Sequence, residues 1–236
     1  MSQRTRVYRY DFRGHLLLPA TASGAGSPFV KADTSSAGSP TVQGANAGGL
    51  ALTLDSTTEV QNVCVYMGDV LPFDIDDLVR CEIIAKGVAT QDSATSMAFG
   101  LASARNDAID SIAAHASFRT IGSNDVVVET DDGTNDKDDI ATGVTLVAQF
   151  KRFAIDFTGI QTREPPLTSL GGKGNVAFLA GNSYGQLRRV ASGTLFDMSN
   201  YSSGLQLYFQ IQKTSDNNTD ALTILEASVE VKLPYS

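Results

Sequence analysis

The stretch Leu205-Gln-Leu-Tyr-Phe-Gln-Ile-Gln-Lys213 alternates apolar and polar side chains from one residue to the next. The stretch Leu225-Glu-Ala-Ser-Val-Glu-Val-Lys-Leu233 repeats the pattern. Successive side chains of a β-strand point to opposite faces, so each stretch predicts a strand with one buried and one wet face. Strands of this kind are typical of antiparallel sheets.

The same period of two recurs along the chain in shorter runs, and turn residues separate these runs. The runs are 8–12, 50–54, 97–101 and 153–157, and the turns include Gly48-Gly49, Asp132-Gly133 and Gly181-Asn182. No long amphipathic helix is found, and the best helical candidate is a turn or two around Asn106–Ala114. We therefore expect an all-β fold, an antiparallel two-sheet β-sandwich of the jelly-roll kind.

Residues 1–49 differ in composition from the rest of the chain. Pro19–Gly49 is rich in Ala, Gly, Ser, Thr and Pro, and it is too poor in apolar residues to fold alone. It is either a flexible linker or an excursion across the sandwich surface, anchored by Phe29 and Val30. We favour the excursion, because a strand at Val7–Phe12 needs partners to bury its aromatic side. The expected division is a strand and arm at 1–49 and a jelly-roll domain at 50–236.

The bulk composition limits the possible partners. The net charge of −8 among 236 residues argues against a nucleic-acid-binding surface. No apolar run approaches the length of a membrane span, and no signal-peptide core is present. Cys64 and Cys81 fall inside apparent strands, so we expect buried free thiols and assembly in a reducing cytoplasm.

Basic side chains cluster at the N-terminus, at Arg4, Arg6, Arg9 and Arg13. One interpretation is a strand with solvated charged edges, and the other is a basic arm that touches an acidic partner. We name Arg4, Arg6, Arg9 and Phe29 as the candidate partner-binding residues.

An acidic segment, Glu129–Asp139, could bind calcium through carboxylate oxygens, with Asp131, Asp136 and Asp138 as candidate ligands. The spacing does not match the twelve-residue calcium loop of helix–loop–helix proteins. The alternative is a solvated hairpin loop with Asp-Gly turn chemistry. No other cofactor or metal is expected.

A row of polar residues shares one strand face: Gln206, Tyr208, Gln210 and Gln212. Amides beside a tyrosine could bind sugar hydroxyls there, and we name Gln206, Tyr208 and Gln210 as the possible glycan face. The same row could equally be solvent-exposed or a protein interface. The chain has no tryptophan to stack on a sugar ring.

No catalytic residue is predicted. Retaining β-glucanases carry Glu-x-Asp-x-x-Glu along one strand. Glu129 and Asp131 match its first two positions, but the third position falls on Thr134. His115 has no serine nucleophile on a sharp turn nearby in sequence. The expectation is that the chain is not an enzyme.

Several segments resemble, in their order, one family of viral structural proteins. They are Phe99–Asp107, Ala113–Arg119, Val126–Asp139, Arg152–Thr158, Val176–Asn182, Phe196–Ser199 and Leu205–Lys213, with a looser likeness at Leu50–Asp76. The family comprises structural proteins of tailed-bacteriophage virions, of the capsid-decoration kind, with a concanavalin A-like (lectin/glucanase) sandwich. The resemblance covers roughly Leu50 to Leu233.

The resemblance implies a structural protein that decorates or cements the capsid, made in the host cytoplasm and located on the virion head surface. Its expected partners are the major capsid protein or other virion proteins, together with further copies of itself, and neither nucleic acid nor a membrane. The alternative is a carbohydrate-binding module on a head fibre or tail that adsorbs to a host surface glycan.

Overall fold

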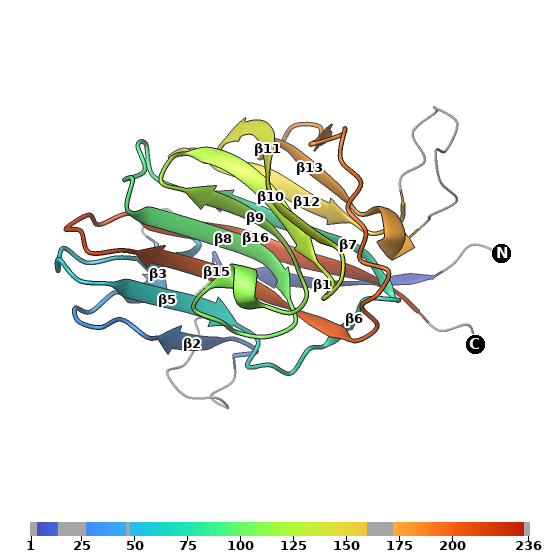
Figure 1. The fold of residues 1–236 in the computed structure, drawn as a ribbon, viewed down its shortest axis with the longest axis horizontal. Coiled ribbons are helices and arrows are strands. Elements are labelled where there is room, and N and C mark those ends of the chain that lie inside the picture. Colours follow the sequence, from blue (N-terminus) through green and yellow to red (C-terminus); the bar gives the residue numbers. More distant parts are fainter. Residues whose placement is uncertain (1–3, 14–26, 46–47, 160–171, 234–236) are drawn as a thin grey trace.

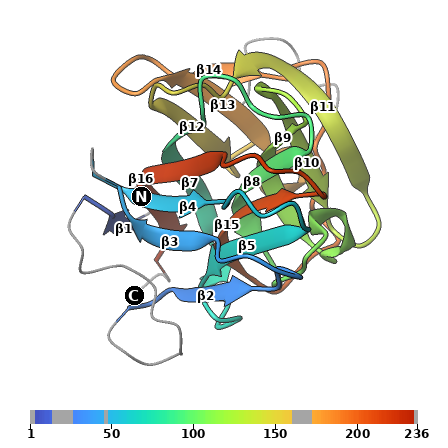
Figure 2. The same ribbon diagram turned by 90° about the vertical axis from the view of Figure 1, so that its left-hand side faces the viewer.

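The computed structural model describes residues 4–13, 27–45, 48–159 and 172–233. Within these ranges the chain is almost entirely β-strand, in two antiparallel sheets that pack face to face (Figures 1 and 2). The predicted all-β, two-sheet sandwich is confirmed. No helix in the described ranges is long and apolar enough to cross a membrane.

Sheet 1 has the strand order β14-β13-β12-β7-β16-β4-β3, and β1 also pairs with β16. Its bounds are β1 Thr5–Asp11, β3 Thr41–Gly44, β4 Leu50–Thr53, β7 Leu78–Lys86, β12 Lys151–Asp156, β13 Ala177–Asn182, β14 Arg188–Val190 and β16 Ala221–Lys232.

Sheet 2 has the order β11-β10-β9-β8-β15-β5-β2, and β6 also pairs with β15. Its bounds are β2 Val30–Asp33, β5 Gln61–Tyr66, β6 Phe73–Asp74, β8 Thr95–Ala102, β9 His115–Ile121, β10 Asp125–Asp131, β11 Asp136–Thr145 and β15 Gly204–Lys213. Two short 3₁₀ turns complete the described elements, η2 Ile109–Ser111 and η3 Gly172–Asn175.

The core lies between the sheets and is built by the apolar half of each alternating strand. Leu205, Leu207, Phe209 and Ile211 of β15 are all fully buried. Beside them a run of phenylalanines links the sheets, with Phe118 of β9 in ring contact with Phe153 of β12 at 4.9 Å. The period of two therefore places these side chains as the sequence predicts.

Residues 1–49 contribute strands to both sheets. β1 and β3 lie in sheet 1, and β2 lies at the edge of sheet 2. Phe12 and Phe29 are buried and contact each other with ring centroids 5.3 Å apart. The described part of this segment is thus built into the sandwich that residues 50–233 form. The stretch 14–26 within it lies outside the described residues.

Candidate functional site

The outer face of sheet 2, which points away from the core, carries the polar half of the alternating strands. The strand register sets side chains in rows across β8, β15 and β5. One row is Gly100, Tyr208 and Tyr66, and the next is Ala98, Gln210 and Cys64. A Cβ at Gly100 would lie 2.3 Å from the Ala116 carbonyl oxygen, so only glycine fits there. The β8 part of this face is therefore flat and lined by small residues.

The connection between β8 and β9, residues 103–114, folds back over this face, and we call it the plug. Its η2 turn lies in front of β15 in Figure 1. Ile109 and Ile112 of the plug are buried, and they form one apolar cluster with residues of the face beneath: Cys64, Ala98, Ala102 and Tyr208. The small residues of β8 leave the room that the two isoleucines fill.

Hydrogen bonds also hold the plug to sheet 2. The Tyr208 hydroxyl donates to the Asn106 carbonyl oxygen at 2.6 Å. The Gln210 amide donates to the Asp107 carbonyl oxygen at 2.9 Å. An ion pair joins the Arg119 guanidinium on β9 to the Asp110 carboxylate on η2. The plug therefore takes up the polar groups of the strands below it.

The candidate glycan face Gln206, Tyr208 and Gln210 is consequently covered. Their exposed fractions are 0%, 1% and 2%. The Gln206 side-chain oxygen accepts from the backbone nitrogens of Met67 and Asp69. Of the alternatives for this row, solvent exposure does not hold at these three residues, because they bind the protein's own loops.

A buried polar cluster lies on β9 and β10, next to the plug. Glu129, His115 and Ser117 are at most 2% exposed, and the Glu129 carboxylate pairs with the Arg119 guanidinium. Glu129 Oε2 lies 3.6 Å from His115 Nε2. Neither of these two atoms, nor Ser117 Oγ, has a hydrogen-bond partner among the described residues. Burial raises the pKa of Glu129, against the opposing effects of His115 and Arg119.

The raised pKa of Glu129 predicts how the stability of the fold depends on pH. The unfolded chain releases the Glu129 proton near the ordinary pKa of 4.5, whereas the folded chain holds it to higher pH. The contribution of Glu129 to stability is therefore fullest below 4.5 and declines as pH rises through the folded pKa. We expect the melting temperature of Glu129→Gln, relative to the parent protein, to increase with pH across this window. A relative melting temperature that stays constant or decreases would contradict the raised pKa.

A pocket of about 230 Å³ opens beside the plug. Its floor is a row of polar side chains across four neighbouring strands or their ends: Ser96, Gln212, Asn62 and Thr34. Asp107 of the plug forms part of the wall. Apolar side chains at the pocket are Val60 and Ala94.

The Asp107 carboxylate is fixed in place by its neighbours. Its Oδ1 atom accepts from the Thr34 hydroxyl at 2.7 Å and from the Asn62 amide at 2.9 Å, and it pairs with the Arg105 guanidinium. In contrast, no hydrogen bond joins the side chain of Ser96 or Gln212 to another described residue. The pocket therefore combines one oriented carboxylate with an amide and a hydroxyl that are free to bind a ligand.

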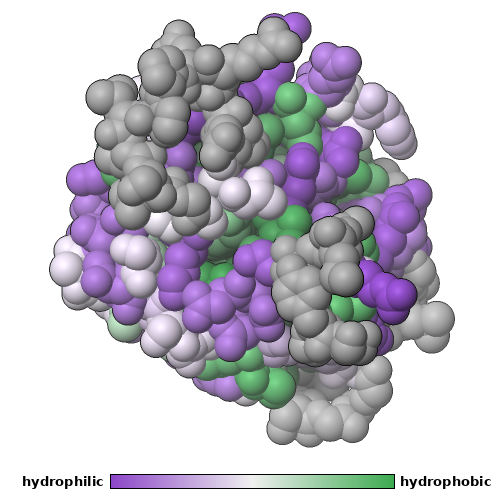
Figure 3. Space-filling model, turned by 90° about the vertical axis from the view of Figure 1, so that its right-hand side faces the viewer, coloured by the Kyte–Doolittle hydropathy of each residue, from purple (hydrophilic) through white to green (hydrophobic). Residues whose placement is uncertain are grey.

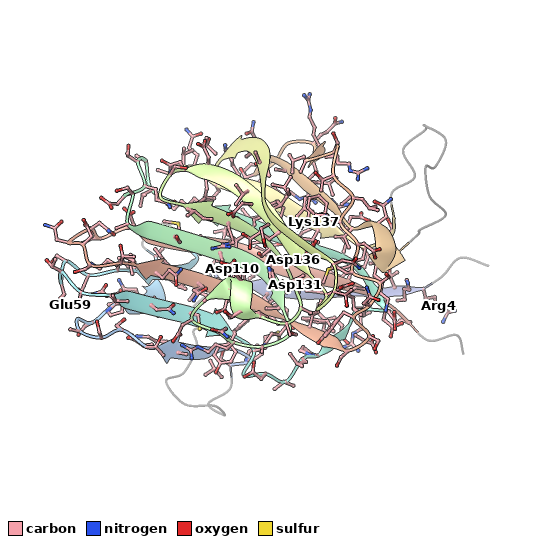
Figure 4. The ribbon with its side chains drawn as sticks, viewed as in Figure 1. Arg4, Glu59, Asp110, Asp131, Asp136 and Lys137 are labelled. Carbon is pink, nitrogen blue, oxygen red and sulfur yellow. The ribbon has the colours of Figure 1, made fainter. Side chains whose placement is uncertain are left out.

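The candidate calcium ligands are not gathered into a site. Asp131 accepts the Gly133 backbone N–H at 2.7 Å, in the Asp-Gly turn of the β10–β11 hairpin. Burial raises the pKa of Asp138, and a hydrogen bond with Asp136 adds to this rise. Asp110, Asp131 and Asp136 are labelled in Figure 4. Among the described residues, no three His, Cys, Asp or Glu side chains come together in a way that could hold a metal ion.

The candidate partner-binding residues are placed very differently from one another. Arg4 is exposed, and it lies at the opposite end of the molecule from Glu59 (Figure 4). The Arg6 guanidinium sits 4.7 Å above the Tyr8 ring, and Arg9 pairs with Glu226 at 2.7 Å. Phe29 is 1% exposed, so it cannot attach to an outside partner as expected. It belongs to the core because β1 and β2 pair on opposite sheets and enclose it.

The surface of the described residues at the right-hand end of Figure 1 is largely hydrophilic, with separate apolar groups between the polar ones (Figure 3).

The pocket residues Asn62, Ser96 and Asp107 were not among the sequence-based candidates. Gln212 ends the row of Gln206, Tyr208 and Gln210 that the sequence suggests as a glycan face, and it is the one member of that row that lines the pocket. Asp107 and Thr34 meet only through the fold, and no local pattern links them.

No protein-family model matches the chain, and no curated protein matches it in sequence. Solved structures do match. SCLam, a non-specific endo-β-1,3(4)-glucanase from family GH16, has a TM-score of 0.60 at 12% identity, covering 99% of this chain and 94% of that one. The Bacillus licheniformis β-glucanase has a TM-score of 0.57 at 10% identity, covering 94% and 97%. The exoplasmic/lumenal domain of VIP36, in a Ca²⁺- and Man3GlcNAc-bound form, has a TM-score of 0.53 at 9% identity, covering 93% and 89%.

These likenesses correct two expectations. The prediction that the chain is not an enzyme is wrong, because glucanases are among the proteins that share its fold over nearly its whole length. The structures named above give no support to a bacteriophage virion or capsid-decoration role. At these identities the likeness shows the fold alone. The chain has a concanavalin-like jelly-roll sandwich of the kind found in glucanases and carbohydrate-recognition domains.

Proposed function

We propose that this protein binds carbohydrate in the pocket beside the plug. The observation that carries the proposal is the polar floor of Ser96, Gln212 and Asn62 with the oriented Asp107 carboxylate at its wall. The glucanases and carbohydrate-recognition domains with the same fold give the ligand class. The virion-surface role expected from the sequence has no such support, and the glycan-binding alternative replaces it.

The chemistry of the pocket suits sugar hydroxyls, each of which both donates and accepts a hydrogen bond. The Gln212 amide offers a donor and an acceptor, and the Ser96 hydroxyl offers both. Asp107 Oδ2 is an acceptor without a partner among the described residues, while the bonds to Oδ1 hold the carboxylate still. A fixed acceptor loses little side-chain entropy when the ligand binds. Val60 and Ala94 can contact the apolar C–H face of a ring.

Replacing Gln212 with alanine tests the proposal. The variant should bind a β-1,3(4)-glucan tetrasaccharide about 10-fold more weakly than the parent, because each lost hydrogen bond contributes about 0.5–1.5 kcal/mol. Isothermal titration calorimetry measures the affinity. The melting temperature should not change, since the Gln212 side chain has no hydrogen bond to another described residue.

Ser228→Ala, on the opposite sheet, is the matched control and should bind as the parent does. Equal affinities for parent and Gln212→Ala would remove the pocket from the proposal, and Man3GlcNAc is titrated in parallel as a second glycan. Because glucanases share the fold, the oligosaccharide is also recovered and weighed by mass spectrometry. A shortened product would add turnover to binding.

A further inference from the structure

The plug is built as an Ω-loop, a compact surface loop whose two ends lie close together. At its neck the Ser103 backbone N–H donates to the Ala114 carbonyl oxygen at 2.8 Å, and the Ala114 N–H donates to the Ser103 hydroxyl. Between these ends the plug pairs with none of the described strands. It is held by the two isoleucines, by side-chain hydrogen bonds and by the Arg119–Asp110 ion pair. Opening the plug about this neck would therefore break no pairing between the described strands.

The plug leaves part of the polar surface on β9 and β10 unsatisfied. Buried polar atoms almost always have a partner, and each one without a partner is destabilising. Here three such atoms lie on adjacent strands: His115 Nε2, Ser117 Oγ and Glu129 Oε2. The closed plug thus gains apolar burial at Ile109 and Ile112, but it leaves polar groups that water or a ligand would satisfy.

We propose that the plug is displaceable and covers a second, longer section of the glycan site, an inference that rests on the proposed function. Asp107 links the two sections, since it lines the open pocket and its carbonyl oxygen accepts from Gln210 below the plug. A glycan longer than the pocket extends along the outer face of sheet 2 and takes the place of the plug.

The surface that opening would uncover is suited to a polyhydroxylated chain. The Tyr208 hydroxyl and the Gln210 amide, which now bind plug carbonyls, would bind sugar hydroxyls instead. Ser117 and His115 add further polar groups, and the small residues of β8 form a flat floor. A long glycan binds only to molecules in which the plug is displaced. Its apparent affinity therefore depends on the fraction of molecules in that open state.

The two native cysteines report the opening. Cys64 lies under the plug in the cluster with Ile109, whereas Cys81 is fully buried between the sheets. Burial raises the pKa of both thiols, so neither reacts while it is covered. Iodoacetamide labelling at pH 8.5, followed by mass spectrometry, should modify Cys64 at least 10-fold faster than Cys81 in the unliganded parent.

The variant Ile109→Ala weakens the closed plug. Cys64 of this variant should be labelled at least 5-fold faster than Cys64 of the parent, while the labelling rate of Cys81 should not change. The variant should also bind a β-1,3(4)-glucan hexasaccharide at least 3-fold more tightly than the parent does. Binding of a disaccharide of the same glucan should not become tighter, because opening the plug gives it no new surface near the pocket and moves Asp107 away from the pocket wall. Ile155→Ala, in the core between the sheets, is the matched control and should not accelerate Cys64 selectively.

The inference about the plug is overturned if the two cysteines of the parent label at equal rates, or if Ile109→Ala binds the hexasaccharide no more tightly than the parent. In either case the proposed function still stands as long as the parent binds the disaccharide. If neither protein binds a glycan of any length, the proposed function fails and the glycan site under the plug fails with it.

Discussion

Replacing Arg119 with methionine is expected to destabilise the protein by about 3–5 kcal/mol at neutral pH. The Glu129 carboxylate is 0% exposed and pairs with the Arg119 guanidinium. Without that guanidinium the buried Glu129 carboxylate loses the one arginine or lysine that pairs with it among the described residues. Chemical denaturation followed by intrinsic fluorescence or circular dichroism measures the loss.

The double variant Arg119→Met/Glu129→Gln is the control. It removes the charge together with its partner, so most of the lost stability should return. The stability that Arg119→Met loses relative to the parent should also be smaller at acidic pH, where Glu129 becomes protonated. A single variant as stable as the parent at neutral pH would show that Glu129 is not buried as the structure has it.

Replacing Phe29 with alanine is expected to cost about 3–5 kcal/mol, the usual range for deleting a buried aromatic ring. Phe29 is in ring contact with Tyr10, Phe12 and Phe209, so it joins β1 and β2 to the central strand β15. The free energy of unfolding in urea measures the effect. The slope of the transition should stay the same if the variant remains two-state.

Phe29→Leu keeps most of the apolar volume, so its loss should be much smaller than that of the alanine variant. If Phe29→Ala lowers the free energy of unfolding by less than about 1 kcal/mol, Phe29 would instead be a surface anchor on a separate arm. The two outcomes distinguish a segment built into the sandwich from one laid over it.

The fold could be predicted from the sequence because the alternation in strands such as β15 records which side faces the core. Leu205, Leu207 and Phe209 are buried between the sheets as the pattern requires. The opposite half of the pattern was less informative. A polar residue facing away from the core can meet water or another segment of the chain, and the alternation does not distinguish them.

Tyr208 shows this limit. Its place on the outer face follows from the sequence, but its burial depends on residues 103–114 folding back from β8. The predicted turn around Asn106–Ala114 is present as η2, yet nothing local indicates what it covers. Phe29 shows the same limit for the core, since its partners Tyr10 and Phe209 lie far away in sequence.

The absence of a second glutamate after Glu129 led to the wrong expectation that the chain is not an enzyme. A motif tests one arrangement of residues along one strand, whereas the fold places side chains from several strands on the same face. The glucanases that match the chain do so at 10% and 12% identity. Their likeness lies in the path of the backbone, which a search for one motif cannot detect.

The central claim is that the pocket at Asn62, Ser96, Asp107 and Gln212 binds glycan. The most direct test is a titration of ¹⁵N-labelled protein with a β-1,3(4)-glucan tetrasaccharide, followed by two-dimensional NMR. The account predicts saturable shifts at the backbone amides of these four residues and at the side-chain amide of Gln212, with sheet 1 unaffected. No shifts, or shifts confined to the outer face of sheet 1, would contradict it.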